Sequence, residues 1–172
     1  LENLLSANRI AIDQKSLTFS CVIHPENFSL EMGVYPLLAG VALVHALEKD
    51  LPCKPQLKWP NDLMIGGKKV AGILIERAGN SQEGPLPLIM GIGLNVQGLI
   101  KEFPEELQEK LTTLEEVTGE TFSLETTFQT ILTHLELLLQ QLHREGAPSL
   151  IKQWQDASCS LNQSILYEGE DG

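Results

Sequence analysis

Residues 58–76 read KWPNDLMIGGKKVAGILIE, and this stretch holds most of the information on how the chain folds. It contains two short apolar runs, LMI and VAGILI, whose β-branched residues predict strands. Gly66 and Gly67 separate the runs, and a Gly-Gly pair favours a two-residue hairpin turn because both residues tolerate positive φ. The hairpin would fold Asp62 back toward Lys69, so that a carboxylate and an ammonium lie close together at one end of a sheet.

Polar residues are crowded around this hairpin. A lysine such as Lys69 suits a phosphate, and Asn61 with Asp62 suits the orientation of a nucleophile or a metal ion. Gly72 removes a side chain from the second strand, where a ligand needs close access to the backbone. The alternative is an ordinary surface hairpin with solvated lysines, but the bulky, rigid Trp-Pro dipeptide that enters the turn argues against it.

A second stretch, LIMGIGLNV at 88–96, predicts another strand. Side chains alternate between the two faces of a strand, so Gly91 and Gly93 leave a flat strip of backbone on one face. A flat ligand ring fits such a strip, and Asn95 stands where it can hydrogen-bond the edge of the ring. The alternative is a helix packed closely over the glycines, and the spacing favours neither. It is not a dinucleotide-binding fingerprint, which needs a third glycine and a following helix.

The motifs KWPND, KVAGILIE and GIGLNV follow one another along the chain. In this order and at about this spacing they resemble the catalytic domain of the biotin–protein ligases, and the resemblance extends from about Ala7 to the C-terminus. It implies an α+β fold in which a mixed β-sheet is flanked by helices, the class II synthetase-like fold that lipoate ligases share. The Trp-Pro-Asn-Asp element is expected in the biotin enzymes and not in lipoate ligases.

The resemblance implies a two-step reaction. Biotin and ATP, with Mg²⁺ as cofactor, give biotinyl-5′-AMP and pyrophosphate, and the biotinyl group then passes to a lysine of the biotin carboxyl carrier protein of acetyl-CoA carboxylase. Two alternatives stay open: a catalytically inactive biotin-binding module, and a lipoate or octanoate ligase or transferase on the same fold.

The resemblance also implies roles for individual residues. Lys69 matches the lysine that contacts the biotin carboxylate and the adenylate phosphate, and Asp62 is expected to orient the incoming carrier lysine. The other implied contacts are Gln14, Gly72, Gly91 and Gly93 with biotin, Asn95 with the adenine side, and Asn61 with Asp62 for Mg²⁺.

The chain departs from the family pattern in two places. A glycine- and arginine-rich loop is expected after Gln14, but Lys15 already begins the next predicted strand. We expect this loop, and the N-terminal start of the domain, to be missing from the sequence rather than deleted in the protein. The resemblance assigns residues 1–160 to the catalytic domain and residues 161–172 to the beginning of a truncated C-terminal β-barrel domain.

Composition narrows the class of protein. The net charge of −11 argues against nucleic-acid binding, although four of the 12 basic residues fall between Lys54 and Lys69, where an anionic ligand would be bound. Cys21, Cys53 and Cys159 form neither a metal motif nor a disulfide framework, which favours the cytoplasm. No stretch is apolar for long enough to span a membrane. Whether the protein forms a homodimer stays open.

Other segments complete the predicted fold. Residues 1–5 suggest the end of a helix, and strands are predicted at 8–13 and 17–23. Residues 36–48 predict a helix that is apolar on more than one side, as expected for burial against a sheet. Trp59 is assigned to the core or to the site with equal weight.

Capping residues mark two further helices. Thr113 and Glu116 suit a capping box before a short helix that Gly119 ends, and Ser123 suits the cap of a long helix. The apolar stripe of the long helix has a period of about 3.6 and is predicted to be core. It comprises Phe128, Ile131, Leu132, Leu135, Leu138, Leu139 and Leu142.

Overall fold

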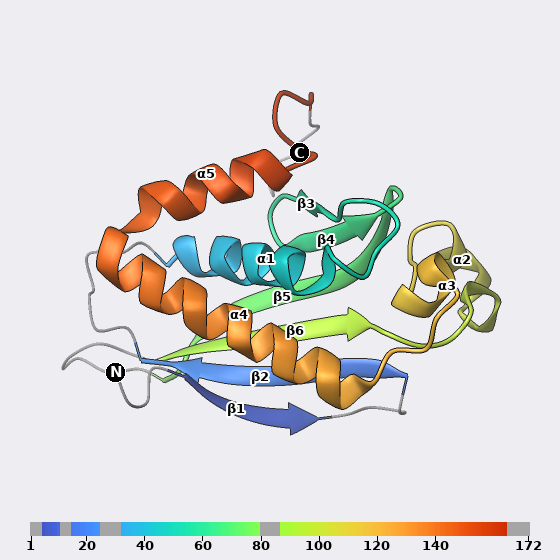
Figure 1. The fold of residues 1–172 in the computed structure, drawn as a ribbon, viewed down its shortest axis with the longest axis horizontal. Coiled ribbons are helices and arrows are strands. Elements are labelled where there is room, and N and C mark those ends of the chain that lie inside the picture. The colour runs from blue at the N-terminus through green and yellow to red at the C-terminus, as the bar shows by residue number, and fades with distance from the viewer. Residues whose placement is uncertain (1–4, 11–14, 25–31, 80–86, 165–172) are drawn as a thin grey trace, which may run out of the picture.

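The computed structural model describes residues 5–10, 15–24, 32–79 and 87–164. Within them, six strands form one sheet in the order β1-β2-β6-β5-β4-β3 (Figure 1). The strands are β1 Leu5–Ile10, β2 Ser16–Ile23, β3 Gln56–Lys58, β4 Asp62–Ile65, β5 Lys68–Arg77 and β6 Leu88–Asn95. The helices are α1 Val34–Leu47, the 3₁₀ turn η1 Ile100–Glu102, α2 Glu105–Gln108, α3 Leu114–Thr118, α4 Leu124–Glu145 and α5 Ala147–Ala157.

The sheet confirms the α+β class but differs in one detail. All pairings between the six strands are antiparallel, whereas the sequence predicted a mixed sheet. Among the described residues, parallel pairing occurs as two isolated bridges, Lys69 with Leu111 and Leu57 with Ser158.

The three long helices cover one face of this sheet (Figure 1). Alternate residues of β2 and β6 are buried on that face, and Phe19 of β2 meets Phe128 of α4 with ring centroids 5.0 Å apart. Gly91 and Gly93 alternate with these buried residues and therefore lie on the opposite face. The alternative of a helix packed over the glycines is wrong.

The central helix α1 confirms the helix predicted at 36–48. It packs against α4 and α5 on one side and against β5, β4 and β3 on the other, which explains why it is apolar nearly all round. The stripe of α4 is buried or half-buried, as predicted, and α5 contributes Trp154, which is 8% exposed. Cys21 is buried, and its burial raises the thiol pKa to about 11, so the sulfur stays protonated and belongs to the core.

The predicted caps are present. Thr113 Oγ1 accepts the N–H of Glu116, Gly119 ends α3 with φ of 73°, and Ser123 Oγ accepts the N–H of Thr126. The capping box differs in its second half, because the Glu116 carboxylate accepts the N–H of Ile100 from a different segment.

The N-terminal prediction was partly wrong. Leu5 lies in strand β1 rather than in a helix, while residues 1–4 of the predicted helix end lie outside the described residues, and β1 starts three residues before the predicted strand at 8–13. The last part of that predicted strand and the expected β-barrel strand near the C-terminus lie outside the described residues, as does Gln14 with the expected loop. None of the described helices has both the length and the apolar character needed to cross a bilayer.

Leu135→Ala tests the core assignment of α4. Leu135 is 0% exposed, so its truncation leaves a cavity and should lower the free energy of unfolding by about 2–5 kcal/mol in urea denaturation. Leu137, 54% exposed on the same helix, is the matched control, and Leu137→Ala should change stability by less than about 0.5 kcal/mol. Equal losses in the two variants would show that the buried side of α4 has been misassigned.

Candidate active site

The β4–β5 hairpin forms as the sequence predicted. Gly66 and Gly67 both have positive φ, 58° and 79°, which suits a tight two-residue turn. The turn returns β5 beside β4, and Lys69 Nζ lies 2.5 Å from Asp62 Oδ1. This ion pair confirms the predicted approach of carboxylate and ammonium.

Gly72 makes room for the lysine side chain. A Cβ built on Gly72 would lie 3.2 Å from Lys69 Nζ and 3.3 Å from Lys69 Cε, so the end of the lysine passes directly over this glycine. Asp62 Oδ1 is buried and forms no hydrogen bond within the described residues, which leaves the ammonium as its partner. The two side chains are 39% and 22% exposed, so solvent screens the pair and an incoming anion can compete for the ammonium.

A cavity of about 250 Å³ lies beside this ion pair. It is formed by β2, β5, β6 and the chain that follows α2. Its lining residues are Ser16, Thr18, Lys69, Val70, Ala71, Gly72, Gly93, Leu94, Asn95 and Leu111. Four predicted site residues from two strands therefore converge on one cavity, with Asp62 at its edge.

A larger cavity, of about 570 Å³, lies between the end of α1 and the start of α4. It contains none of the predicted site residues. We place the candidate site in the smaller cavity because the Lys69 ammonium and the bare backbone of Gly72 and Gly93 meet there.

The side-chain amides of two asparagines, Asn95 and Asn61, donate hydrogen bonds to backbone carbonyls. Asn95 Nδ2 donates to the carbonyl of Thr112 at 3.1 Å, and Asn95 also lines the cavity. Asn61 Nδ2 donates to the carbonyl of Ile73 at 2.8 Å, and the Ile73 N–H returns to the carbonyl of Asn61 at 2.9 Å. Asn61 therefore joins the start of β4 to β5 and does not line the cavity.

The fit of Mg²⁺ depends on the same residues. No group of three His, Cys, Asp or Glu side chains suited to a metal occurs in the described ranges. Asp62 supplies one carboxylate beside the cavity. Mg²⁺ commonly takes one or two carboxylates and completes its shell with substrate phosphates and water, so these residues fit an ion that arrives with a nucleotide.

Other predicted residues have different positions. Gly91 shares the open face with Gly93 but does not line the cavity. The Trp59 residue is 59% exposed, and its backbone N–H donates to Ser160 Oγ. The interpretation of Trp59 as a core residue is therefore wrong.

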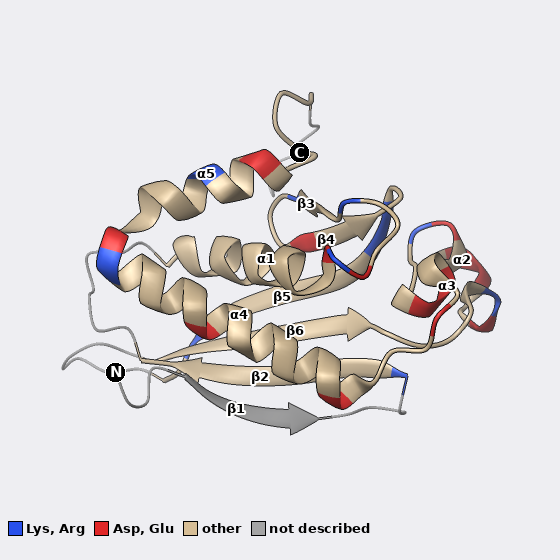
Figure 2. Ribbon diagram, in the orientation of Figure 1, with Lys and Arg blue, Asp and Glu red and all other residues tan. Residues whose placement is uncertain are grey.

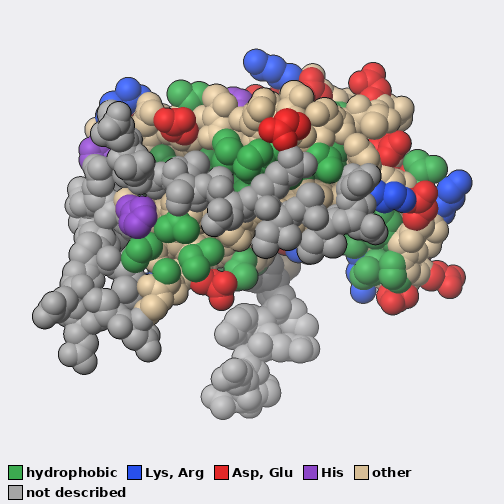
Figure 3. Space-filling view, turned by 90° about the horizontal axis from the view of Figure 1, so that it is seen from below, with side chains coloured by type: hydrophobic (Ala, Val, Ile, Leu, Met, Phe, Trp, Pro, Cys, Tyr) green, Lys and Arg blue, Asp and Glu red, His purple; other side chains and the backbone are tan. Residues whose placement is uncertain are grey.

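Charged residues of both signs occur at the β4–β5 hairpin and around α2 and α3 (Figure 2). Basic side chains mark the β4–β5 hairpin, and Lys68 Nζ leaves the cavity to donate to the carbonyl of Gln108 at 2.9 Å. Acidic side chains gather with lysines around α2 and α3, at the right of Figure 3. Lys15 bonds Glu102 there and lowers the pKa of that carboxyl by its hydrogen bond and its charge.

Two parts of the site were missed from the sequence. Ser16 and Thr18 face the cavity from β2, and Thr18 pairs directly with Gly93. Their signal was the alternation of Ser16, Thr18 and Ser20 with apolar residues. The other part is Leu111, which pairs with Lys69 of β5 through an isolated parallel bridge. The two residues are far apart in the sequence, so no local sequence pattern predicts this contact.

Comparison with known proteins identifies the family. The model of the biotin/lipoate A/B protein ligase family matches residues 9–95, half of the 172-residue chain. The bifunctional ligase/repressor BirA of Bacillus subtilis is 31% identical over 146 residues, which cover 85% of this chain and 45% of that protein. A biotin–[acetyl-CoA-carboxylase] ligase of Paracoccus denitrificans is 40% identical over 81 residues, covering 45% of this chain and 32% of that protein. The chain thus spans less than half the length of either relative.

Solved structures agree. The biotin protein ligase of Aquifex aeolicus in complex with biotin and ATP has a TM-score of 0.73 and 30% identity to this chain, covering 84% of it and 59% of the ligase. The apo form of the same ligase has a TM-score of 0.74 and 29% identity, covering 84% of this chain and 61% of the ligase. The chain therefore belongs to the biotin/lipoate A/B protein ligase family and has the fold of a biotin protein ligase catalytic domain.

Proposed function

We propose that the chain activates biotin with ATP to biotinyl-5′-AMP and transfers the biotinyl group to a lysine of the biotin carboxyl carrier protein of acetyl-CoA carboxylase. The observation that carries this proposal is the Lys69 ammonium at the edge of a small, glycine-floored cavity. The Aquifex aeolicus relative was solved with biotin and ATP, and the Paracoccus denitrificans relative is named for the carboxylase.

The cavity suits a small bicyclic acid. Its volume of about 250 Å³ lies below the usual range of about 300–1,000 Å³ for drug-sized ligands, so it holds biotin better than a whole adenylate. The bare backbone at Gly93 gives the flat ring a floor, and Ser16 and Thr18 offer hydroxyls to the polar edge of the ring. Asn95 then faces the adenine side.

Adenylation places charge beside Lys69. A biotin carboxylate oxygen attacks the α-phosphorus of ATP, forming one phosphorus–oxygen bond while the bond to pyrophosphate breaks. Lys69 leaves Asp62 for the phosphate and stabilises the charge that grows as the reaction proceeds. Mg²⁺ bound with the triphosphate, and held through Asp62, would shield its charge.

Transfer uses the carboxylate that Lys69 has left. The carrier lysine must lose a proton before its amine attacks the carbonyl carbon of the mixed anhydride and releases AMP. Asp62 would accept that proton and orient the amine. Because Asp62 is paired with Lys69, it becomes available only after the phosphate has drawn the ammonium away.

Gly72→Ala tests the path of the Lys69 side chain. The added Cβ would lie 3.2 Å from Lys69 Nζ, so the flexible end of the lysine must shift while the backbone stays in place. We expect adenylation to slow by about tenfold to a hundredfold, with a smaller change in biotin affinity. Gly33→Ala is the control, because a Cβ there meets nothing within 4 Å and its φ is −63°. Equal adenylation rates in the two variants would contradict the placement of the Lys69 side chain over Gly72.

Carrier transfer tests the whole proposal. The purified chain is incubated with biotin, ATP, Mg²⁺ and a biotin carboxyl carrier domain, and the carrier is weighed by mass spectrometry. A gain of one biotinyl group on lysine supports the proposal. Thermal shifts that favour lipoate over biotin would instead support a lipoate or octanoate enzyme, and biotin binding without transfer would support an inactive biotin-binding module. We place the reaction in the cytoplasm, in keeping with the free Cys21, Cys53 and Cys159.

A further inference from the structure

The backbone of Lys69 is hydrogen-bonded to residues 110–112, a segment distant from it in the sequence. Its N–H donates to the carbonyl of Lys110 at 2.8 Å, and its own carbonyl accepts the N–H of Thr112 at 2.9 Å. These bonds form the isolated parallel bridge between Lys69 and Leu111. With β4 on its other side, the Lys69 backbone is held from both sides, which sets the point from which its side chain extends over Gly72.

The same segment holds a second site residue. Asn95, at the end of β6, donates from Nδ2 to the carbonyl of Thr112 at 3.1 Å. Thr112 is 3% exposed, so both of its backbone contacts are shielded from water. Residues on two neighbouring strands, Lys69 and Asn95, thus share one support.

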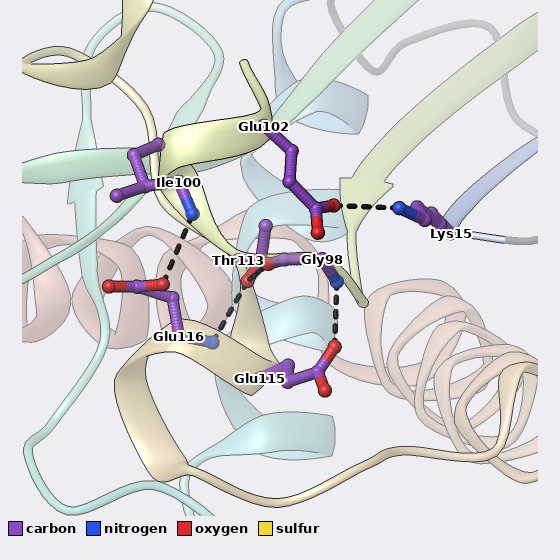
Figure 4. A network of polar contacts seen from close by, with 7 residues as sticks. All are labelled: Lys15, Gly98, Ile100, Glu102, Thr113, Glu115 and Glu116. Atoms are coloured by element: carbon purple, nitrogen blue, oxygen red, sulfur yellow. Dashed lines mark hydrogen bonds and ion pairs between the residues drawn. The ribbon is translucent and has the colours of Figure 1, made fainter.

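Thr113 fixes this support (Figure 4). Its side chain is 0% exposed, and Oγ1 donates to the carbonyl of Gly98 at 2.7 Å while it accepts the N–H of Glu116 at 2.9 Å. The carboxylate of Glu115 closes the ring by accepting the N–H of Gly98 at 2.7 Å. One buried hydroxyl therefore joins the loop that leaves β6 to the start of α3, directly beside Thr112.

We propose that Thr113 is a positioning residue for the adenylation step, acting through the Lys110–Thr112 segment on Lys69 and Asn95. Thr113 does not line the cavity, so it is not a catalytic residue. Loss of the Thr113 hydroxyl would loosen the Lys110–Thr112 segment. The Lys69 ammonium and the Asn95 amide would then be displaced from the cavity. A displacement of this kind slows chemistry more than it weakens substrate binding.

Thr113→Val removes the hydroxyl at nearly constant shape, and Thr113→Ser retains it. The matched control is Thr118→Val in the same α3 segment. Thr118 Oγ1 donates to the carbonyl of Leu114 and accepts the N–H of Glu120, but it has no link to Thr112. The rate measurement in this test rests on the proposed function. A second measurement, the hydrogen exchange of the Lys69 and Thr112 amides, does not depend on activity.

In Thr113→Val we expect these two amides to exchange about tenfold faster, as follows from the loss of two hydrogen bonds at a buried hydroxyl. We also expect kcat for pyrophosphate release to fall by about tenfold to a hundredfold with little change in the KM for biotin. Thr113→Ser should restore both, and Thr118→Val should change neither. If Thr113→Val does not fold, Glu115→Ala opens the same ring at a partly exposed residue and should give the same pattern.

Unchanged exchange at Lys69 and Thr112 would overturn the inference, as would equal effects of Thr113→Val and Thr118→Val on kcat. If the unaltered chain releases no pyrophosphate with biotin, the proposed function fails, and the exchange measurement alone decides whether Thr113 supports Lys69.

Discussion

Lys69→Ala should cost roughly 2–4 kcal/mol of transition-state stabilisation in the adenylation step, the range found when one well-placed charge-stabilising group is removed. Lys69 lines the cavity, and its ammonium, on a side chain that is 39% exposed, pairs with the Asp62 carboxylate, so an incoming phosphate can compete for it. Pyrophosphate release at saturating biotin and ATP measures the loss.

Lys68→Ala is the matched control for this prediction. Lys68 is the neighbouring residue, but its ammonium donates to the carbonyl of Gln108 and does not line the cavity. Its loss should therefore cost far less than the loss of Lys69. Mild and equal effects of the two substitutions would contradict the assignment of Lys69 to the phosphate.

Gly93→Val should abolish biotin binding while the fold survives. A Cβ at Gly93 would meet only Thr18 Oγ1, at 4.0 Å, so the sheet accepts the side chain, but the isopropyl group then occupies the cavity floor. Calorimetry with biotin should detect no binding, and the circular dichroism spectrum should change little.

Ser20→Val controls for the insertion of a branched side chain on this face. Ser20 pairs with Gly91 on the same face of the sheet and does not line the cavity, so this variant should bind biotin normally. If Gly93→Val also binds biotin normally, the glycine strip is only a packing feature.

The local parts of the fold were predictable from the sequence. The turn at Gly66 and Gly67 needs positive φ, the glycine strip on β6 follows from alternation, and Thr113 and Ser123 cap the helices they precede. Each of these features depends on residues within a few positions, so the sequence pattern contains the cause.

The remaining features depend on contacts between distant segments. The Glu116 carboxylate bonds Ile100 rather than completing its own capping box, and the backbone of Lys69 is held by residues 110–112. Trp59 is exposed although its size and aromatic character suit a core. Neither periodicity nor composition indicates which distant segment a backbone group will meet, which is why the support behind Lys69 was not predicted.

The pairing of Lys69 with Asp62 connects the two proposed half-reactions. Each residue neutralises the other at the edge of the cavity. A nucleotide phosphate that draws the ammonium away frees the carboxylate for the carrier lysine. Adenylation should therefore precede activation of the second nucleophile.

Formation of biotinyl-5′-AMP is the decisive measurement. The purified chain is incubated with biotin, Mg²⁺ and ATP labelled at the α-phosphate, without carrier protein, and the products are separated and identified by mass. We expect biotinyl-5′-AMP to form with one pyrophosphate per adenylate, and to form far more slowly in Lys69→Ala. Tight biotin binding with no labelled adenylate and no pyrophosphate would contradict the proposed activity and leave a biotin-binding module.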